Sequence, residues 1–143
     1  MPDRVPNDHP SVRTFRAHLA RSGGTHRPCL RLPDEVDLAA GDVIRLVLDG
    51  TQYHAPVSED AQGLLVRGAF DNRRLARAAG EGENRLVEWA AAHDRDPGDA
   101  VDLDEVQAGY LYGLRVPGER AVYEATERPN QSLADIARDL EDR

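Results

Sequence analysis

Alternating hydrophobic and polar positions predict β-strands over much of the chain. The strongest segment is the aliphatic run 43–48, whose β-branched and leucine residues are typical of a central strand. Shorter alternating runs on either side are separated by Gly, Pro and Asp, which favour turns. The predicted strands are residues 12–19, 29–32, 43–48, 51–55, 63–68, 108–116 and 121–125.

The spacing of hydrophobic residues changes from a strand-like to a helix-like period in the middle of the chain and again at its end. Residues 71–79 predict a short helix that Asp71 caps and Gly80 ends, and residues 83–93 predict a second helix. A third, amphipathic helix is expected from Ser132 onward. Its apolar stripe (Leu133, Ile136, Ala137 and Leu140) packs on the protein's own body or docks on a second chain. The predicted class is α+β: a small, mostly antiparallel, barrel-like sheet with two mid-chain helices and a C-terminal amphipathic helix.

The domain organisation follows from these elements. The proline-containing segment 1–11 is expected to be a flexible lead-in, residues 12–128 a single barrel-like α+β domain, and residues 129–143 the C-terminal helix. Gly-Asp at 41–42 is echoed at 98–99, which leaves open whether the chain holds an internal repeat. No apolar run approaches the ~20 residues of a membrane span, and no signal peptide is expected, so we expect no membrane partner.

Gly23 and Gly24 lie between two alternating runs and predict a hairpin with a two-residue turn. In that register His18 lies opposite Cys29, and Arg16 lies opposite Arg31. One face of the hairpin is apolar and the other is basic. Two arginines directly opposite each other repel, so the pair indicates a bound anion, a nearby carboxylate or a different register.

Composition adds an unusual charge pattern. All 18 basic residues are arginine, against 26 acidic residues, which gives a net charge of −8 over 143 residues. An acidic surface without lysine resembles that of haloarchaeal cytoplasmic proteins, because hydrated carboxylates keep a protein dissolved in concentrated salt. The alternative is an acidic protein from a GC-rich organism. The single cysteine excludes an intramolecular disulfide framework.

The segment 30–50 carries a weak family resemblance. Leu32-Pro33, then Gly41-Asp42 before the strand at 43–48, resemble the swapped-hairpin units of AbrB-type transcription regulators. The resemblance implies a small β-barrel, often dimeric, that binds DNA through arginines. The turn between Val36 and Gly41 is shorter than in that family, and the added helices depart from it, so the resemblance supports a barrel more than DNA binding. The whole chain also resembles uncharacterised conserved proteins of haloarchaea.

Two arginine clusters are the candidate binding site. Residues 9–33 contain five arginines, three histidines and no acid, and a second cluster consists of Arg67, Arg73, Arg74 and Arg77. The arginine fork matches phosphate oxygens, which suggests contact with a nucleic-acid backbone. The residues assigned to this contact are Arg16, Arg27, Arg31, Arg73, Arg74 and Arg77. Alternatively, these arginines pair with the protein's own surplus carboxylates.

No catalytic residue, metal ligand or cofactor is predicted. His18, His26 and Cys29 do not complete a zinc set, and the acidic segment 94–105 lacks glycine at the position a calcium loop needs. The leading hypothesis is a non-enzymatic binding protein of a halophilic archaeal cytoplasm that contacts nucleic acid. The alternatives are a protein–protein assembly module or homodimer whose arginines meet acidic surfaces, and an enzyme with a site in the barrel mouth.

Overall fold

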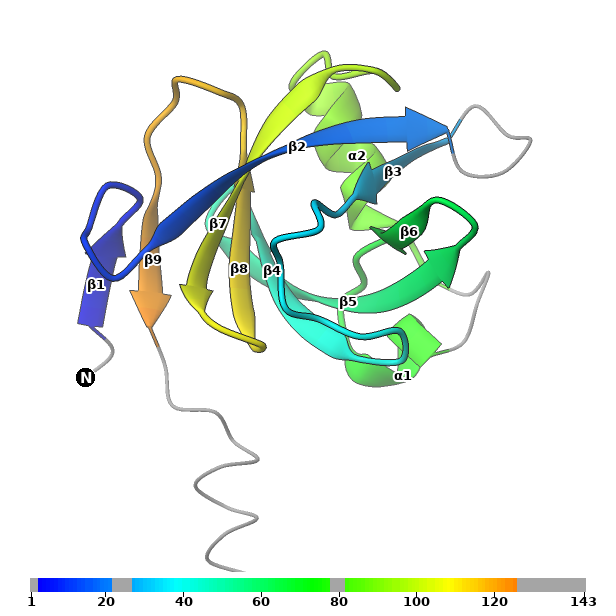
Figure 1. Cartoon of the computed structure of the whole chain (residues 1–143), viewed down its shortest axis with the longest axis horizontal. Coiled ribbons are helices and arrows are strands. Elements are labelled where there is room, and N and C mark those ends of the chain that lie inside the picture. The colour runs from blue at the N-terminus through cyan, green and yellow to red at the C-terminus, as the bar shows by residue number, and fades with distance from the viewer. Residues whose placement is uncertain (1–2, 22–26, 78–81, 126–143) are drawn as a thin grey trace, which may run out of the picture.

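The computed structural model describes residues 3–21, 27–77 and 82–125. Within these ranges lie nine strands and two short helices (Figure 1). The strands are β1 (Asp3–Pro6), β2 (Arg13–Arg21), β3 (Pro28–Arg31), β4 (Val43–Leu48), β5 (Thr51–Asp60), β6 (Gly63–Val66), β7 (Ala100–Gln107), β8 (Leu111–Arg115) and β9 (Val122–Ala125). The helices are α1 (Arg73–Arg77) and α2 (Arg85–Ala92).

Seven of these strands close into a barrel in the order β2-β3-β6-β5-β4-β8-β7, with β7 pairing back to β2. Neighbouring barrel strands are antiparallel except β4 and β8, which run parallel. Strands β1 and β9 form a separate two-stranded ribbon beside the barrel (Figure 1). Closure removes the free edges that an open sheet of this size would expose.

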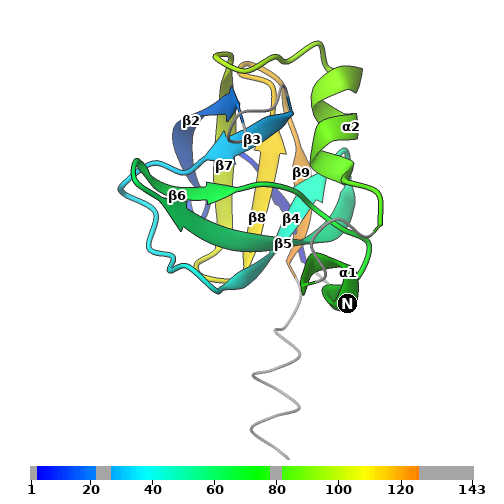
Figure 2. The same cartoon turned by 90° about the vertical axis from the view of Figure 1, so that its right-hand side faces the viewer.

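The core fills the inside of the barrel. Phe15, Ala17 and Leu19 alternate along β2 and point inward, where they join the inward side chains of the other barrel strands. The buried face of α2, which includes Leu86 and Trp89, belongs to the same cluster. This helix therefore closes the barrel interior beside β3 and β4 (Figure 2).

The α+β class predicted from the sequence is wrong, because the described chain is mostly β and its helices are short. Helix α1 covers only five residues, and its first turn is capped by Asn72, whose Oδ1 accepts from Leu75 N at 2.8 Å. Asp71 does not cap it, because its carboxylate binds Arg85 instead. The expected C-terminal helix at 129–143 lies outside the described residues. None of the described helices has the length and apolar character needed to cross a membrane.

Two strands were not expected. Residues 100–107 form β7, with Val101 and Leu103 facing the core and Asp102 and Asp104 on the outer side. The beginning of this strand overlaps the acidic segment 94–105, for which no strand was predicted. Strand β1 lies inside the segment 1–11 that was expected to be a lead-in, and it pairs with β9.

The predicted register of the first hairpin is wrong by two residues. His18 pairs with Arg31 and Ala20 with Cys29, so the pairs His18–Cys29 and Arg16–Arg31 are not formed. A shift of two keeps every side chain on its expected face, and the apolar face is as predicted. Arg16 lies instead opposite Asp102 of β7, which replaces the repulsion by an ion pair.

Candidate nucleic-acid interface

Two of the hairpin arginines, Arg16 and Arg31, are bound to the protein's own carboxylates. Arg16 Nε donates to Asp102 Oδ1 at 2.8 Å. The guanidinium of Arg31 donates to both carboxylate oxygens of Asp60, at 2.8 and 2.9 Å. This bidentate bond is the main reason that the pKa of Asp60 falls to about 2. Arg16 and Arg31 are therefore each paired with a carboxylate of the described chain, as the alternative interpretation of the sequence expects for these two residues.

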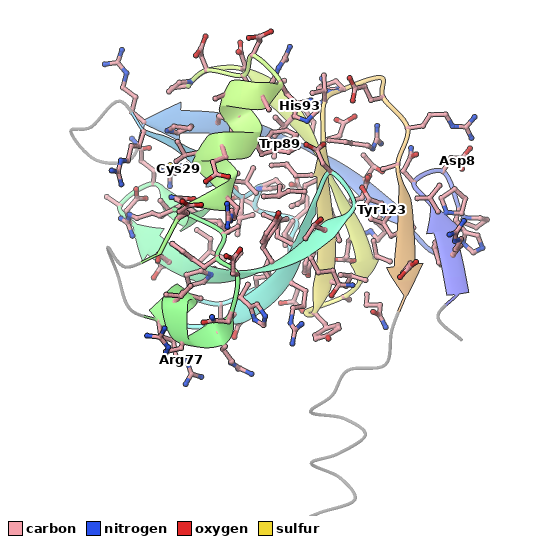
Figure 3. The ribbon with its side chains drawn as sticks, turned by 180° about the vertical axis from the view of Figure 1, so that it is seen from behind. Asp8, Cys29, Arg77, Trp89, His93 and Tyr123 are labelled. Atoms are coloured by element: carbon pink, nitrogen blue, oxygen red, sulfur yellow. The ribbon has the colours of Figure 1, made fainter. Side chains whose placement is uncertain are left out.

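A second group of arginines is not neutralised in this way. Arg45 of β4 and His54 of β5 are cross-strand partners on the outer side of the barrel. Arg73 begins α1 and acts on His54 electrostatically, and Arg77 follows one helical turn later. We call Arg45, His54, Arg73 and Arg77 the basic surface. Figure 3 shows Arg77 on α1, away from Tyr123 on β9.

The pKa of His54 reflects the positive charges of the basic surface. Its side chain is half-buried, and its pKa lies below the ordinary value of 6.5 because of burial first, and then the charges of Arg45 and Arg73. Among the described residues, Arg45, Arg73 and Arg77 have no carboxylate within ion-pair distance, although the Arg45 guanidinium lies 5.7 Å from the centre of the Tyr110 ring. Positive groups are thus gathered without a counterion from the described chain.

A groove of about 730 Å³ adjoins the basic surface. It lies over the outer side of β5, between α1 and α2, and its apolar lining includes Pro56, Phe70 and Ala76. Phe70 is tied to His54 by two backbone hydrogen bonds of 2.8 and 2.9 Å, so the groove and the basic surface share one rigid support. Arg27 and Arg67 also line the groove.

Three acidic residues beside the groove form ion pairs with one arginine. Arg85 forms ion pairs with Asp71 at 2.9 Å, Glu83 at 2.7 Å and Glu88 at 3.0 Å. Hydrogen bonding to Arg85 lowers the pKa of Asp71, and the same contacts raise the pKa of Arg85. Arg67 has no carboxylate within ion-pair distance among the described residues. One guanidinium offsets only one of these three negative charges, whereas the charge of Arg67 acts on Asp60 without an ion pair.

Asn84 holds the two sides of the groove together. Its amide nitrogen donates to Arg67 O at 3.0 Å, and its oxygen accepts from Leu86 N at 3.1 Å, which caps α2. The same oxygen accepts from Ala69 N at 3.3 Å. The side chain packs so closely on Gly68 that a Cβ at this position would overlap it. The start of α2 is thereby fixed to the segment that follows β6.

A smaller cavity, of about 210 Å³, offers the alternative chemistry of a histidine and a carboxylate. His93 Nε2 lies 2.8 Å from Asp49 Oδ1, and the His93 ring packs on Trp89 with centroids 4.8 Å apart. Among the described residues that line this cavity there is no serine, threonine or cysteine nucleophile. Asp49 is exposed and sits in a tight turn before Gly50, so the pair serves to tie the end of α2 to the β4–β5 turn.

The family model of DUF7112, a family of unknown function, matches residues 1–140. The chain belongs to this family. No curated protein and no solved structure matches the chain. The family assignment agrees with the expectation of an uncharacterised conserved family and brings no activity with it, so the site must be judged from its own geometry.

The six arginines that the sequence of this DUF7112 member assigned to nucleic acid lie in three different places in the structure. Arg16 and Arg31 are ion-paired on the hairpin, Arg27 lines the groove, and the other three lie on α1. Arg45 and His54 were missed. A signal for them was present, because the Asp49-Gly50 turn places position 45 opposite position 54, and Arg45 interrupts an aliphatic strand with an outward charge.

The predicted opposition of His18 and Cys29 is not formed, since His18 lies opposite Arg31. Cys29 is buried, and burial is the main cause that raises the pKa of its thiol. Across residues 3–21, 27–77 and 82–125, no group of three or more His, Cys, Asp or Glu side chains could hold a metal ion.

Proposed function

We propose that this protein is a non-enzymatic binding protein that holds nucleic acid by its phosphates on the basic surface. The observation that carries the proposal is the cluster of Arg45, His54 and Arg73, which come from three separate elements and have no compensating carboxylate among the described residues. Bringing like charges together costs free energy, and a bound anion removes that cost.

The arginine side chain matches the phosphates of a nucleic acid better than it matches other anions of the cell surface or of the solvent. Its planar fork binds two phosphate oxygens at once, and several arginines in a row follow a repeating backbone. His54, with its lowered pKa, is a neutral hydrogen-bonding group near pH 7 and becomes charged more readily once an anion is bound. The overall charge of −8 opposes non-specific binding. Contact is therefore confined to the basic surface.

The proposed setting is the cytoplasm of a salt-rich archaeal cell. The support is compositional: 26 acidic residues and no lysine. At about 1 M salt the Debye length is only ~3 Å, so a ligand is held by contact-range pairs rather than by long-range attraction. A preformed cluster such as Arg45 and Arg73 makes contact-range pairs of this kind, so it can bind a phosphate in concentrated salt.

The experiment measures fluorescence anisotropy of labelled mixed-sequence DNA and RNA with the full chain, from about 50 mM to about 1 M KCl. The test variant is Arg73→Gln/Arg77→Gln, and the matched control is Arg4→Gln, an exposed arginine on β1 across the barrel from α1 (Figure 1). We expect the double variant to weaken binding about tenfold or more and to reduce the salt slope by about one unit per lost contact. Absence of binding at the lowest salt by a chain with an intact circular dichroism spectrum would overturn the proposal and direct the search to an acidic protein partner.

A further inference from the structure

The groove next to the basic surface has an apolar, recessed lining that phosphate binding alone does not explain. Its apolar lining of Pro56, Phe70 and Ala76 is recessed between two helices and half-exposed at Phe70. The volume of about 730 Å³ falls within the range of sites that enclose small organic groups, roughly 300–1,000 Å³. A backbone of phosphates and sugars does not need such a recess.

The position of Phe70 links the groove to the phosphate contacts. Phe70 and His54 exchange two backbone hydrogen bonds, and Arg73 follows Phe70 by three residues. The backbone of an aromatic residue is thus fixed next to that of His54, a member of the basic surface. Proteins that bind single strands combine the same two elements, a positively charged path and aromatic rings on which bases stack.

The positive charges at Arg67 and on the adjoining basic surface fit an anionic ligand that carries an aromatic group. Arg85 offsets part of the negative charge of Glu83 and Glu88 on the α2 side, and Arg67 contributes an exposed positive charge at the groove lining. A ligand chain that extends from Arg73 on α1 into the groove, which Ala76 of α1 and Arg67 both line, therefore meets positive charge outside the groove and at its lining.

We infer that the ligand is a single-stranded nucleic acid, with one unpaired base inserted in the groove against Phe70 and its phosphates held by Arg67 and Arg73. This inference rests on the proposed function. In a duplex the bases are stacked and paired inside the double helix, so a duplex leaves the groove empty unless a base is extruded at a cost in free energy. The protein consequently prefers single strands over duplexes.

Three probes separate the base from the backbone: a labelled single strand of about 12 nucleotides, an abasic backbone of the same length, and a duplex of the same sequence. Each is titrated by anisotropy against the full chain and against Phe70→Ala and Phe70→Leu. The matched control is Val122→Ala, which truncates an exposed apolar side chain on β9, 57% exposed. Circular dichroism checks that each variant is folded.

We expect the single strand to bind about tenfold or more tightly than either other probe, since stacking on an aromatic ring contributes at this level. Phe70→Ala reduces single-strand affinity to that of the abasic backbone and leaves abasic binding unchanged. Phe70→Leu, which keeps an apolar side chain without a ring, also loses most of the preference. Val122→Ala changes none of the three affinities.

Two results overturn the inference and can be told apart. Equal binding of all three probes, still sensitive to Arg73→Gln/Arg77→Gln, leaves phosphate binding in place and removes the role of the base. Absence of arginine-dependent binding for every probe removes the proposed function as well. A preference for single strands that Phe70→Ala and Phe70→Leu leave intact contradicts the assignment of the base to this groove.

Discussion

Tyr123 donates a hydrogen bond from its hydroxyl to the carboxylate of Asp104, and this contact joins the β1–β9 ribbon to the outer side of the barrel. Asp104 is fully buried and also accepts from Thr14 Oγ1 at 2.6 Å and from Arg115 Nε at 2.8 Å. Burial, followed by the bond to Asp104, raises the pKa of Tyr123. A charged group this deeply buried depends on every one of its donors.

We therefore expect Tyr123→Phe to lower the free energy of unfolding by about 1–3 kcal/mol, because a buried acceptor loses a donor while the ring remains in place. Urea unfolding measures the change. The matched control is Tyr53→Phe, since the half-buried Tyr53 forms no hydrogen bond through its hydroxyl among the described residues. Equal effects of the two substitutions would contradict a specific role for the Asp104 contact.

Gly113 provides the space in which the Tyr123 ring lies. A Cβ at position 113 would overlap that ring, so β9 packs across β8 only where a side chain is absent. We expect Gly113→Ala to lower the free energy of unfolding by about 1–3 kcal/mol or more, as overpacking does. A double-mutant cycle with Tyr123→Ala is the check: in that background the cost of Gly113→Ala should largely disappear. An unchanged cost would mean that the glycine serves another purpose.

The ion pair between Arg31 and Asp60 makes stability depend on pH. The pKa of Asp60 is lowered from 3.8 to about 2, first by the Arg31 hydrogen bond, so the folded state holds this carboxylate ionised more strongly than the unfolded state does. The stabilisation is present above about pH 4 and is lost as the pH falls through 2. We expect the melting temperatures of the wild type and Asp60→Asn to differ most above pH 4 and to converge near pH 2. A constant difference across this range would be inconsistent with the pair.

The strands were predictable where a local pattern determines them, and the barrel's closure was not. The run 43–48 predicts β4 because nearly every residue in it favours a strand, and its turn at Asp49-Gly50 determines its pairing with β5. Closure depends on the parallel pairing of β4 with β8 and on the pairing of β2 with β7. Both join segments far apart in the chain, and no local pattern encodes them.

The candidate site was only partly predictable for the same reason. Arginine clusters are visible in the sequence, but whether an arginine is neutralised depends on its distant neighbours. Arg31 of β3 meets Asp60 at the end of β5, and Arg16 meets Asp102 of β7. Asp102 and Asp104 resembled a solvated acidic turn because acids at alternate positions rarely indicate a buried strand. The ribbon that supplies Tyr123 to Asp104 comes from the two ends of the described chain.

The last prediction concerns His54 as a reporter of the bound anion. Burial and the charges of Arg45 and Arg73 lower its pKa from 6.5, and a phosphate between these groups should raise it again. Proton binding and anion binding then favour each other, so affinity for nucleic acid should increase as the pH falls through and below 6.5. His54→Gln should remove this increase and leave affinity at pH 8 nearly unchanged. NMR titration of the histidine ring protons, with and without a saturating single strand, checks the shift directly, with exposed His18 as the internal control. If the His54 pKa is the same in both titrations, the anion does not lie between Arg45 and Arg73.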